Sequence, residues 1–485
     1  ESHCCWYCGR GEETLPTKLQ KCGRCGLAEY CNRECQRGDW KIHKAKCKRL
    51  TEIVVDTDVE NRLRSGALKR RLLTLSGGTV ILTVRDPDIT TIGDMNLTVE
   101  RAHLEAPFFE CKSLLRVDLK GCTKLTSVGT GAFALCSSLT SVVFPDSLTH
   151  VGDGAFDGCT SLTSVVFPDS LTQLGVQPFG SCSSLTSVVF PDSLTQLGDY
   201  AFGKCTSLTS VVFPKSLTQI GQQAFSWCNS LTSVVLPDSL TQVGKLAFGD
   251  CTSLTSVVMP VNITQLGVAA FQACTSLMSV VLPDSLTQLG EAAFAGCSSL
   301  TSMVLPDSLT QVGIGAFGDC TSLMSVVLPD SVTEIGKLAF LRCSSLPSMV
   351  LPDSLTQLGE SAFAGCSFLM SVVLPDSAEL GNDVFMDCNA LALKAALAGF
   401  YTVEPYLRDR YKSITLRKLV LRLLRKYNQA VNYADGTEVD KHACALAQFP
   451  ADNSGSLEVG LFLQKMNISG GDGVIGLVGY ILEFV

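Results

Sequence analysis

Residues 206–228 read TSLTSVVFPKSLTQIGQQAFSWC, and this stretch decides the fold because close copies of it recur every 23 residues from Ser137 to Cys366. Self-similarity at a period of roughly 20 to 29 residues, with leucines at fixed positions, is typical of a solenoid in which each copy forms one coil. Cys111 begins a degenerate first coil, and Cys388, one residue early, closes an atypical last coil, as expected for capping units. Cysteines mark the register of the regular coils: Cys136, Cys159, Cys182, Cys205, Cys228, Cys251, Cys274, Cys297, Cys320, Cys343 and Cys366.

Each coil divides into a strand and a return. Leu208, Val211 and Phe213 have the spacing of side chains that point into a core from a strand. Pro214 ends strand pairing because it has no amide hydrogen to donate. In the return we expect Gly221 to permit the bend. The residues expected to cover the core and fill its far side are Leu217, Ile220, Ala224 and Phe225.

The repeat resembles the BspA-like class of leucine-rich repeats, whose hallmark is Leu-Thr-Ser-x-x-x-Pro followed by Ile-Gly-x-x-Ala-Phe-x-x-Cys. These two runs occupy residues 208–214 and 220–228 of the coil quoted above. The resemblance covers well over half of the chain. It implies a β-rich leucine-rich-repeat solenoid built of 23-residue coils.

The strands also carry an outward pattern. If Val211 points into the core, Ser210 and Val212 point away from it. A continuous stripe of exposed valine exceeds what monomers usually leave bare, which indicates a partner-binding surface. A second interpretation stays open, because duplicated repeats also retain valine for its strand propensity. The equivalent valines are Val143, Val166, Val189, Val235, Val258, Val281, Val304, Val327, Val350 and Val373.

The repeat region is acidic. Most copies carry an aspartate after the proline, and many of these aspartates have a local role, because Asp and Ser after Pro satisfy turn amides. The acidic balance argues against nucleic acid as a ligand of the solenoid. The basic residues between positions 137 and 388 are Lys204, Lys215, Lys245, Lys337 and Arg342.

Ahead of the repeats, potential zinc ligands crowd into the first fifty residues. They form the pairs Cys5-x2-Cys8, Cys22-x2-Cys25, Cys31-x3-Cys35 and His43-x3-Cys47. Such nitrogen and sulfur donors suit two tetrahedral zinc ions. A segment this short cannot bury a useful apolar core, so its fold must depend on metal binding, which contributes about 10 to 16 kcal/mol per structural zinc.

This segment closely resembles a MYND zinc finger. The resemblance is carried by Lys-Cys-Gly-Arg-Cys from Lys21, then Tyr30-Cys31, Glu34-Cys35-Gln36, Asp39-Trp40, His43 and Cys47, while the loop from Gly9 to Lys21 is somewhat long for the family. Ligand pairs interleave in MYND fingers, which implies one zinc on Cys5, Cys8, Cys31 and Cys35. It implies the other zinc on Cys22, Cys25, His43 and Cys47. Cys4 is left over, and we interpret it as a spare surface thiol rather than a shuffled ligand.

Four protein ligands per ion leave no coordination position for water or substrate, and closed sites of this kind are structural. The finger is therefore expected to present a surface. The resemblance implies that it binds short, often proline-containing peptides of partner proteins beside Gln36 and Trp40. Trp40 has an alternative role in packing the core between the metals, and the two roles are compatible. Residues 1–50 have more Lys and Arg than Asp and Glu, but zinc-bound thiolates offset most of this excess, so nucleic acid is not favoured.

The solenoid cysteines have a different expected role. Disulfides between successive coils are conceivable on distance. An intracellular chain with thiolate zinc sites instead favours reduced, buried thiols that pack as small hydrophobic groups. We therefore predict packing rather than redox or metal chemistry at these positions.

At 485 residues with 46% apolar content, the chain is expected to be multi-domain. We assign residues 1–50 to the zinc finger, 51–110 to a connector and N-terminal cap, 111–391 to the solenoid, and 392–485 to a C-terminal α/β extension of unknown type. The connector is expected to hold a helix from Val59 to Leu73 and a strand from Thr79 to Val84. Tyr406 to Tyr427 combines helical apolar spacing with many Lys and Arg, which favours an amphipathic helix packed on the last coil over membrane binding.

We do not expect an enzyme. Some MYND proteins are lysine methyltransferases, but we find neither their SET domain nor its Asn-His motif here, and His3, His103, His150 and His442 have no catalytic partner nearby in sequence. We predict an intracellular adaptor, in the cytoplasm or nucleus, whose finger captures peptides and whose solenoid offers an extended surface to other proteins. The alternative is a structural subunit of a large assembly, anchored through the solenoid and C-terminal region. A third option is the substrate-recognition part of a modifying enzyme.

Overall fold

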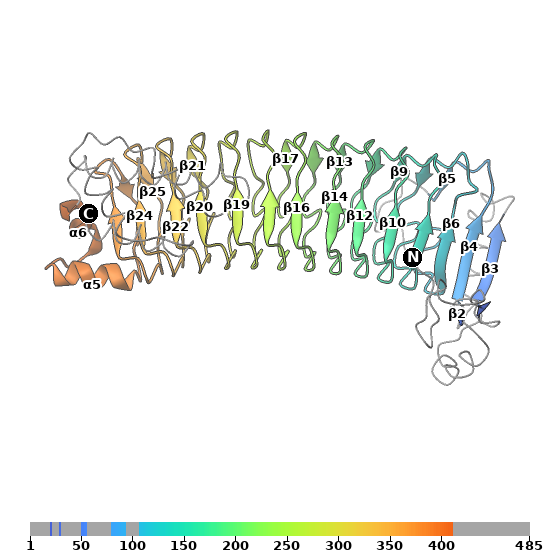
Figure 1. Cartoon of the computed structure of the whole chain (residues 1–485), viewed down its shortest axis with the longest axis horizontal. Coiled ribbons are helices and arrows are strands. Elements are labelled where there is room, and N and C mark those ends of the chain that lie inside the picture. Colours follow the sequence, from blue (N-terminus) through green and yellow to red (C-terminus); the bar gives the residue numbers. More distant parts are fainter. Residues whose placement is uncertain (1–19, 22–28, 31–49, 56–78, 94–105, 411–485) are drawn as a thin grey trace. The chain divides into compact units, whose positions relative to one another are not determined.

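The computed structural model describes residues 20–21, 29–30, 50–55, 79–93 and 106–410 (Figure 1). The chain falls into two compact units, Glu1–Leu194 and Thr195–Val485, and each is described here by itself. The helix expected from Val59 to Leu73 lies outside the described residues. No helix within the described ranges combines the length and the apolar character needed to cross a bilayer.

Two parallel ladders build the first unit. One ladder runs in the order β3 (Leu50–Val55), β4 (Thr79–Val84), β6 (Leu114–Asp118), β8 (Ser141–Val143), β10 (Ser164–Val166) and β12 (Ser187–Val189). The other runs in the order β5 (Thr91–Ile92), β7 (Ser127–Val128), β9 (His150–Val151) and β11 (Gln173–Leu174). β4 coincides with the strand predicted at Thr79–Val84, so the connector extends the sheet of the repeats.

The second unit repeats the same two strand types. The Ser-x-Val strands are β14 (Ser210–Val212), β16 (Ser233–Val235), β18 (Ser256–Val258), β19 (Ser279–Val281), β20 (Ser302–Val304), β22 (Ser325–Val327), β24 (Ser348–Val350) and β26 (Ser371–Val373). The shorter strands of the return are β13 (Gln196–Leu197), β15 (Gln219–Ile220), β17 (Gln242–Val243), β21 (Gln311–Val312), β23 (Glu334–Ile335), β25 (Gln357–Leu358) and β27 (Glu379–Leu380). Parallel pairing joins equivalent residues, as in Gln219 with Gln242 and Val234 with Val257, so each coil advances the chain by one repeat.

The core consists of columns of identical side chains. Neighbouring phenylalanine rings stack at centroid separations of 4.9–5.2 Å from Phe108 to Phe179 in the first unit. They stack at 5.1–5.9 Å from Phe202 to Phe385 in the second. These spacings are up to about 1 Å larger than the separation of about 4.8 Å between paired strands, so one ring per coil follows the rise of the strand ladder.

The predicted core positions of the quoted coil are mostly confirmed. Leu208 and the return residues Leu217, Ile220, Ala224 and Phe225 are buried. Val211 and Phe213 are only half-buried, although their counterparts Val234 and Leu236 in the next coil are buried.

Gly221 is required for a reason different from the predicted one. Its φ lies outside the left-handed region, so the bend itself does not demand glycine. A Cβ at this position would instead lie 2.6 Å from the carbonyl carbon of Gly198 in the preceding coil. Glycine is needed because the two backbones approach closely.

Two helices follow the last strand. α5 (Asn389–Leu397) buries Leu391 and Ala395, and α6 (Val403–Arg410) buries Tyr406 and Leu407. The helix predicted from Tyr406 to Tyr427 therefore starts earlier, at Val403, and its part beyond Arg410 lies outside the described residues.

Candidate functional site

In the leading segment the described residues form a short hairpin. β1 (Gln20–Lys21) and β2 (Glu29–Tyr30) are antiparallel, with Lys21 opposite Glu29 and Gln20 opposite Tyr30. The predicted site residues themselves lie outside the described part of the chain: Cys5, Cys8, Cys22, Cys25, Cys31, Cys35, His43, Cys47, Gln36 and Trp40.

The hairpin lies among the predicted zinc ligands in the sequence. In the chain, Cys22 and Cys25 fall in the loop that joins β1 to β2, whereas Cys31 follows the far end of β2. Ligands of one tetrahedral zinc must converge within a few ångströms, since each Zn–S bond is about 2.3 Å. The assignment of the Cys22–Cys25 pair and Cys31 to separate ions stays a prediction, because these residues lie outside the described part of the chain. Thiolates and an imidazole are also the donors that zinc prefers.

The outer side of the Ser-x-Val strands is the second candidate site. In the first unit Val166 is 78% exposed and Val189 is 59% exposed. In the second unit the exposed fractions are 64% for Val235, 55% for Val258 and 63% for Val281. The middle valine of each of these strands is buried, so the predicted alternation is confirmed here.

The prediction of a continuous exposed stripe is wrong. Val327 and Val350 are 5% exposed and Val373 is 1% exposed, although they occupy the same outward position. Ser348 and Ser371, which also point outward, are buried as well. The outer surface of the second unit thus has an open part at β14, β16, β18 and β19 and a covered part at β22, β24 and β26, with β20 between them.

The cysteines of the coils form a buried column. Most of these thiols donate to the carbonyl of a phenylalanine in the preceding coil, as from Cys228 Sγ to Phe202 O at 3.3 Å and from Cys251 Sγ to Phe225 O at 3.2 Å. Cys122 Sγ instead donates to Val84 O at 3.4 Å. They are free cysteines, so the predicted packing role is confirmed and inter-coil disulfides are absent from the described solenoid. Burial raises the pKa of Cys251 to about 12 and that of Cys297 to about 12, which keeps these thiols neutral and unreactive at neutral pH.

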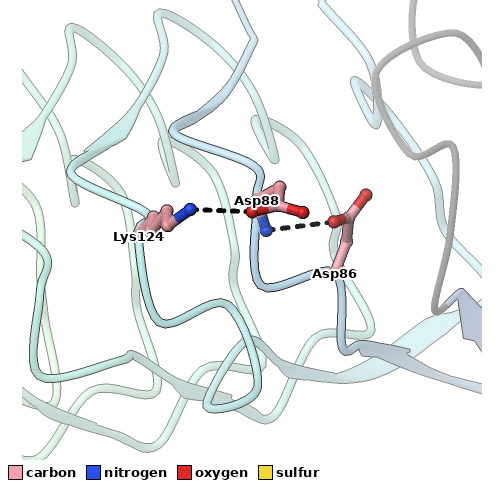
Figure 2. A network of polar contacts seen from close by, with 3 residues as sticks. All are labelled: Asp86, Asp88 and Lys124. Atoms are coloured by element: carbon pink, nitrogen blue, oxygen red, sulfur yellow. Dashed lines mark hydrogen bonds and ion pairs between the residues drawn. The ribbon is translucent and has the colours of Figure 1, made fainter.

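A polar cluster lies at the start of the repeats, and Figure 2 shows its arrangement. Lys124 Nζ lies 2.8 Å from Asp88 Oδ1, and the Asp88 amide donates to Asp86 Oδ1 at 3.1 Å. The hydrogen bond to Asp88 raises the pKa of Lys124. Both are surface contacts: the first ties the turn after β4 to the next coil, and the second lies within that turn. Within the described ranges, no group of His, Cys, Asp and Glu side chains is arranged to hold a metal ion.

His150 is the histidine that the described residues contain, and its surroundings do not form a catalytic pair. Its Nδ1 lies 2.6 Å from Thr149 Oγ1. That hydroxyl already donates its proton to Thr126 O at 3.0 Å, so it accepts from the imidazole. A nucleophile needs the opposite arrangement, in which the hydroxyl donates to the base.

Comparison with family models identifies both segments. A model of the BspA type leucine-rich repeat region matches residues 103–229, 172–299 and 264–392. A model of the MYND finger matches residues 5–47.

Individual relatives match either segment. N-lysine methyltransferase SMYD2-A of Danio rerio is 59% identical over 32 residues, which are 7% of each chain. SET domain-containing protein 14 of Caenorhabditis elegans is 43% identical over 44 residues, 9% of this chain and 10% of that protein. The chain thus spans a tenth or less of these relatives, and the methyltransferase matches cover the finger region only. A leucine-rich repeat protein from Bacteroides ovatus superposes with a TM-score of 0.51 at 27% identity, covering 67% of this chain and 90% of that one.

Proposed function

The chain belongs to the BspA type leucine-rich repeat family and carries an N-terminal MYND finger, and from these two protein-interaction modules we propose that it is an adaptor that joins partner proteins. The finger captures proline-containing peptides, and the solenoid offers an extended surface to a second protein. We place the adaptor inside the cell, in the cytoplasm or nucleus, because zinc thiolates and a column of free cysteines persist in reducing compartments.

The row of exposed valines carries this proposal. Val235, Val258 and Val281 are each more than half exposed on successive paired strands, so their side chains form one apolar strip. Contiguous apolar surface of this kind marks an interaction site.

For the finger we propose two zinc ions with interleaved ligands. One ion is held by Cys5, Cys8, Cys31 and Cys35. The other is held by Cys22, Cys25, His43 and Cys47. Both ions have four protein ligands, so zinc supplies folding energy and the finger supplies a surface. Gln36 and Trp40 line the peptide groove.

The test compares two tryptophans of the full-length protein. Binding of a proline-containing peptide library is measured for the wild type, for Trp40→Ala and for Trp227→Ala, the latter removing a 47% exposed side chain of the solenoid. We expect Trp40→Ala to weaken binding by about tenfold or more and Trp227→Ala to leave it unchanged. Metal analysis of each variant must give the same zinc content. Unchanged binding by Trp40→Ala, or fewer than two zinc ions per wild-type chain, contradicts the proposal.

A second candidate function is a permanent subunit of a large assembly. The apolar strip of Val235, Val258 and Val281 is compatible with it, because the interfaces of permanent complexes are also apolar. The hydrodynamic size of the native protein separates the two functions. An adaptor purifies as a monomer or small oligomer, whereas a subunit stays in a particle of much higher mass.

A further inference from the structure

The open part of the outer face departs from the repeat in two neighbouring coils. Val261, which is 62% exposed, stands where the coils on either side carry Asp238 and Asp284. Met278, which is 56% exposed, stands where the preceding coil carries Thr255. Val261 follows β18 and Met278 precedes β19, so each departure adds an apolar side chain at one end of a strand whose outward valine is itself exposed.

The stability of the solenoid does not account for these departures. Thr255 Oγ1 donates to Thr232 O in the preceding coil at 2.9 Å, and the methionine at the next equivalent position has no hydroxyl to make this bond. Its side chain is more than half exposed, so burial offers little compensation. Later coils also carry methionine here, at Met324 and Met370, but there the side chain is half-buried. An apolar residue left in water beside other exposed apolar residues indicates an interaction surface.

These two residues and the exposed valines of four successive coils form what we call the open strip. β14 lies beside β16, and β16, β18 and β19 are paired in register, so their outward valines stand in one row (Figure 1). Val261 and Met278 widen this row on opposite sides, because one follows its strand and the other precedes its strand. The open strip consists of Val212, Val235, Val258, Val261, Met278 and Val281.

The spacing of the coils favours one shape of partner. In the four coils of the open strip, equivalent phenylalanine rings are 5.4–5.7 Å apart from Phe225 to Phe294. An α-helix rises about 5.4 Å per turn, so a helix laid along the strip offers one apolar side chain to each coil. An extended segment repeats the side chains of one face roughly every 6.6 Å and loses register with the coils sooner. The coil spacing therefore fits a helix better than an extended peptide.

Charge along one side of the open strip indicates the chemistry of that helix. Asp238 and Asp284 are exposed and lie three residues past the outward valines of β16 and β19, so they flank Val261 in one row. Lys215 holds the same position after β14 and bounds the acidic part of the row. Two carboxylates beside an apolar strip are complementary to a helix whose apolar face is edged by lysine or arginine.

We propose that the open strip docks an amphipathic, basic-edged helix of a partner protein. The helix lies along the row of valines, with one apolar side chain per coil and with its basic edge facing Asp238 and Asp284. Val261 and Met278 contact the two flanks of its apolar face. This inference rests on the proposed adaptor function, to which it adds the shape and charge of the solenoid's partner.

A synthetic helix tests the docking on the full-length protein. The probe is a fluorescent helical peptide of about 15 residues, roughly four turns, with leucine once per turn and lysine along one edge of the leucine face. One control peptide has the same composition in scrambled order, and another has glutamate in place of every lysine. By fluorescence anisotropy we expect both controls to bind at least about tenfold more weakly than the probe. Equal binding of the probe and the scrambled peptide overturns the proposal.

Variants of the chain locate the binding. Val261→Asp with Met278→Thr restores the residues that neighbouring coils carry, so it suits the coil, and we expect the affinity for the probe to fall by about tenfold. The matched control is Ile314→Gln, which removes a 47% exposed apolar side chain where the neighbouring coils carry Glu291 and Lys337. This control should bind the probe as the wild type does. Unchanged affinity in the double variant, or an equal loss in the control, overturns the proposal.

Trp40→Ala separates this inference from the proposed function. It should leave binding of the probe unchanged, while the variant Val261→Asp with Met278→Thr should bind proline-containing peptides as the wild type does. If the probe fails to bind while proline-containing peptides still bind through Trp40, the docking inference fails and peptide capture by the finger stands. If Trp40→Ala abolishes binding of the probe, the probe occupies the finger and the docking inference is overturned.

Discussion

At the scale of single residues, close backbone contact between neighbouring coils restricts which side chains fit at some positions. Gly221 and Gly244 occur where the return of one coil touches the return of the previous coil, and a Cβ at Gly244 would lie 2.6 Å from the carbonyl carbon of Gly221. Residues with a left-handed backbone conformation, that is a positive φ, lie at other positions of the coil, and most of them are not glycine. Gln223 has a φ of 51° and Trp227 a φ of 61°. Equivalent positions in other coils hold glycine, as at Gly315 and Gly296.

We predict that Gly244→Ala lowers the free energy of unfolding by about 1 to 3 kcal/mol, because the new methyl group overlaps the backbone of the preceding coil. Gly203→Ala is the matched control. Its Cβ would meet no atom closer than 3.4 Å, and alanine already stands at the equivalent Ala295. Urea unfolding of both variants measures the difference. Equal unfolding midpoints would show that the coils separate easily enough to admit a methyl group.

Sequence reasoning predicted these residues incompletely, for a physical reason. Periodicity reports which side chains share an environment, so it identified Leu217, Ile220 and Phe225 as core. It does not report φ or the distance between two backbones. The need for glycine at Gly221 was therefore recognised but explained by a bend, and the positive φ of Gln223 is signalled only by the glycine at the equivalent position of other coils, such as Gly315.

At the scale of elements, the buried cysteine column makes the stability of the coils depend on pH. Burial raises the pKa of Cys251, Cys297 and Cys388 to about 12, compared with 9.0 for an unperturbed thiol. The folded coils hold these thiols neutral, as hydrogen-bond donors to the phenylalanine carbonyls. In the unfolded chain the same thiols ionise near their ordinary pKa. Their stabilising contribution is thus fully present below about pH 9 and is lost as the pH rises toward about 12.

We predict that the free energy of unfolding falls steeply above about pH 9, by about 1.4 kcal/mol per pH unit for each buried thiol. Urea unfolding at a series of alkaline pH values measures this slope. The variant Cys251→Ala with Cys297→Ala should have a shallower slope, since two titrating groups are gone, and this comparison separates the thiols from lysine and tyrosine. An identical slope in the variant would show that the column does not control the alkaline transition.

The elements also show where local sequence stops being informative. The strand at Thr79–Val84 was predicted because six consecutive residues have strand character. The burial of Val350 and Val373 was not predicted, because their strands read the same as the open ones. The only sequence signal was weak: threonine just before the strand is replaced by Met324, Pro347 and Met370 at the covered strands, but also by the 56% exposed Met278 at an open one. That signal needs comparison between coils rather than inspection of one coil.

At the scale of the whole molecule, two modules fold by different physics. The solenoid is held by strand pairing and by columns of buried Leu, Phe and Cys. The finger is too short for such a core, so its fold depends on its ligands and zinc. Sequence spacing predicted the ligand set, which remains a prediction because those residues lie outside the described part of the chain.

We predict that a strong zinc chelator unfolds the finger and leaves the solenoid folded. Peptide binding should be lost together with zinc, while the urea midpoint of the solenoid, followed by circular dichroism, should stay the same, because its described residues contain no metal site. The control is re-addition of zinc, which should restore binding. A shift of the solenoid midpoint on chelation would show that the two modules are energetically coupled.

Pairing between equivalent residues has a further consequence. Gln219 meets Gln242, and Val257 meets Val280, so every internal coil offers its successor the contacts that it receives from its predecessor. Excision of one internal unit joins two ends that already match, and duplication of a unit inserts a matching piece. The protein's length is thereby free to vary over generations in whole steps, with each step adding or deleting binding surface while the ends that cap it are inherited intact.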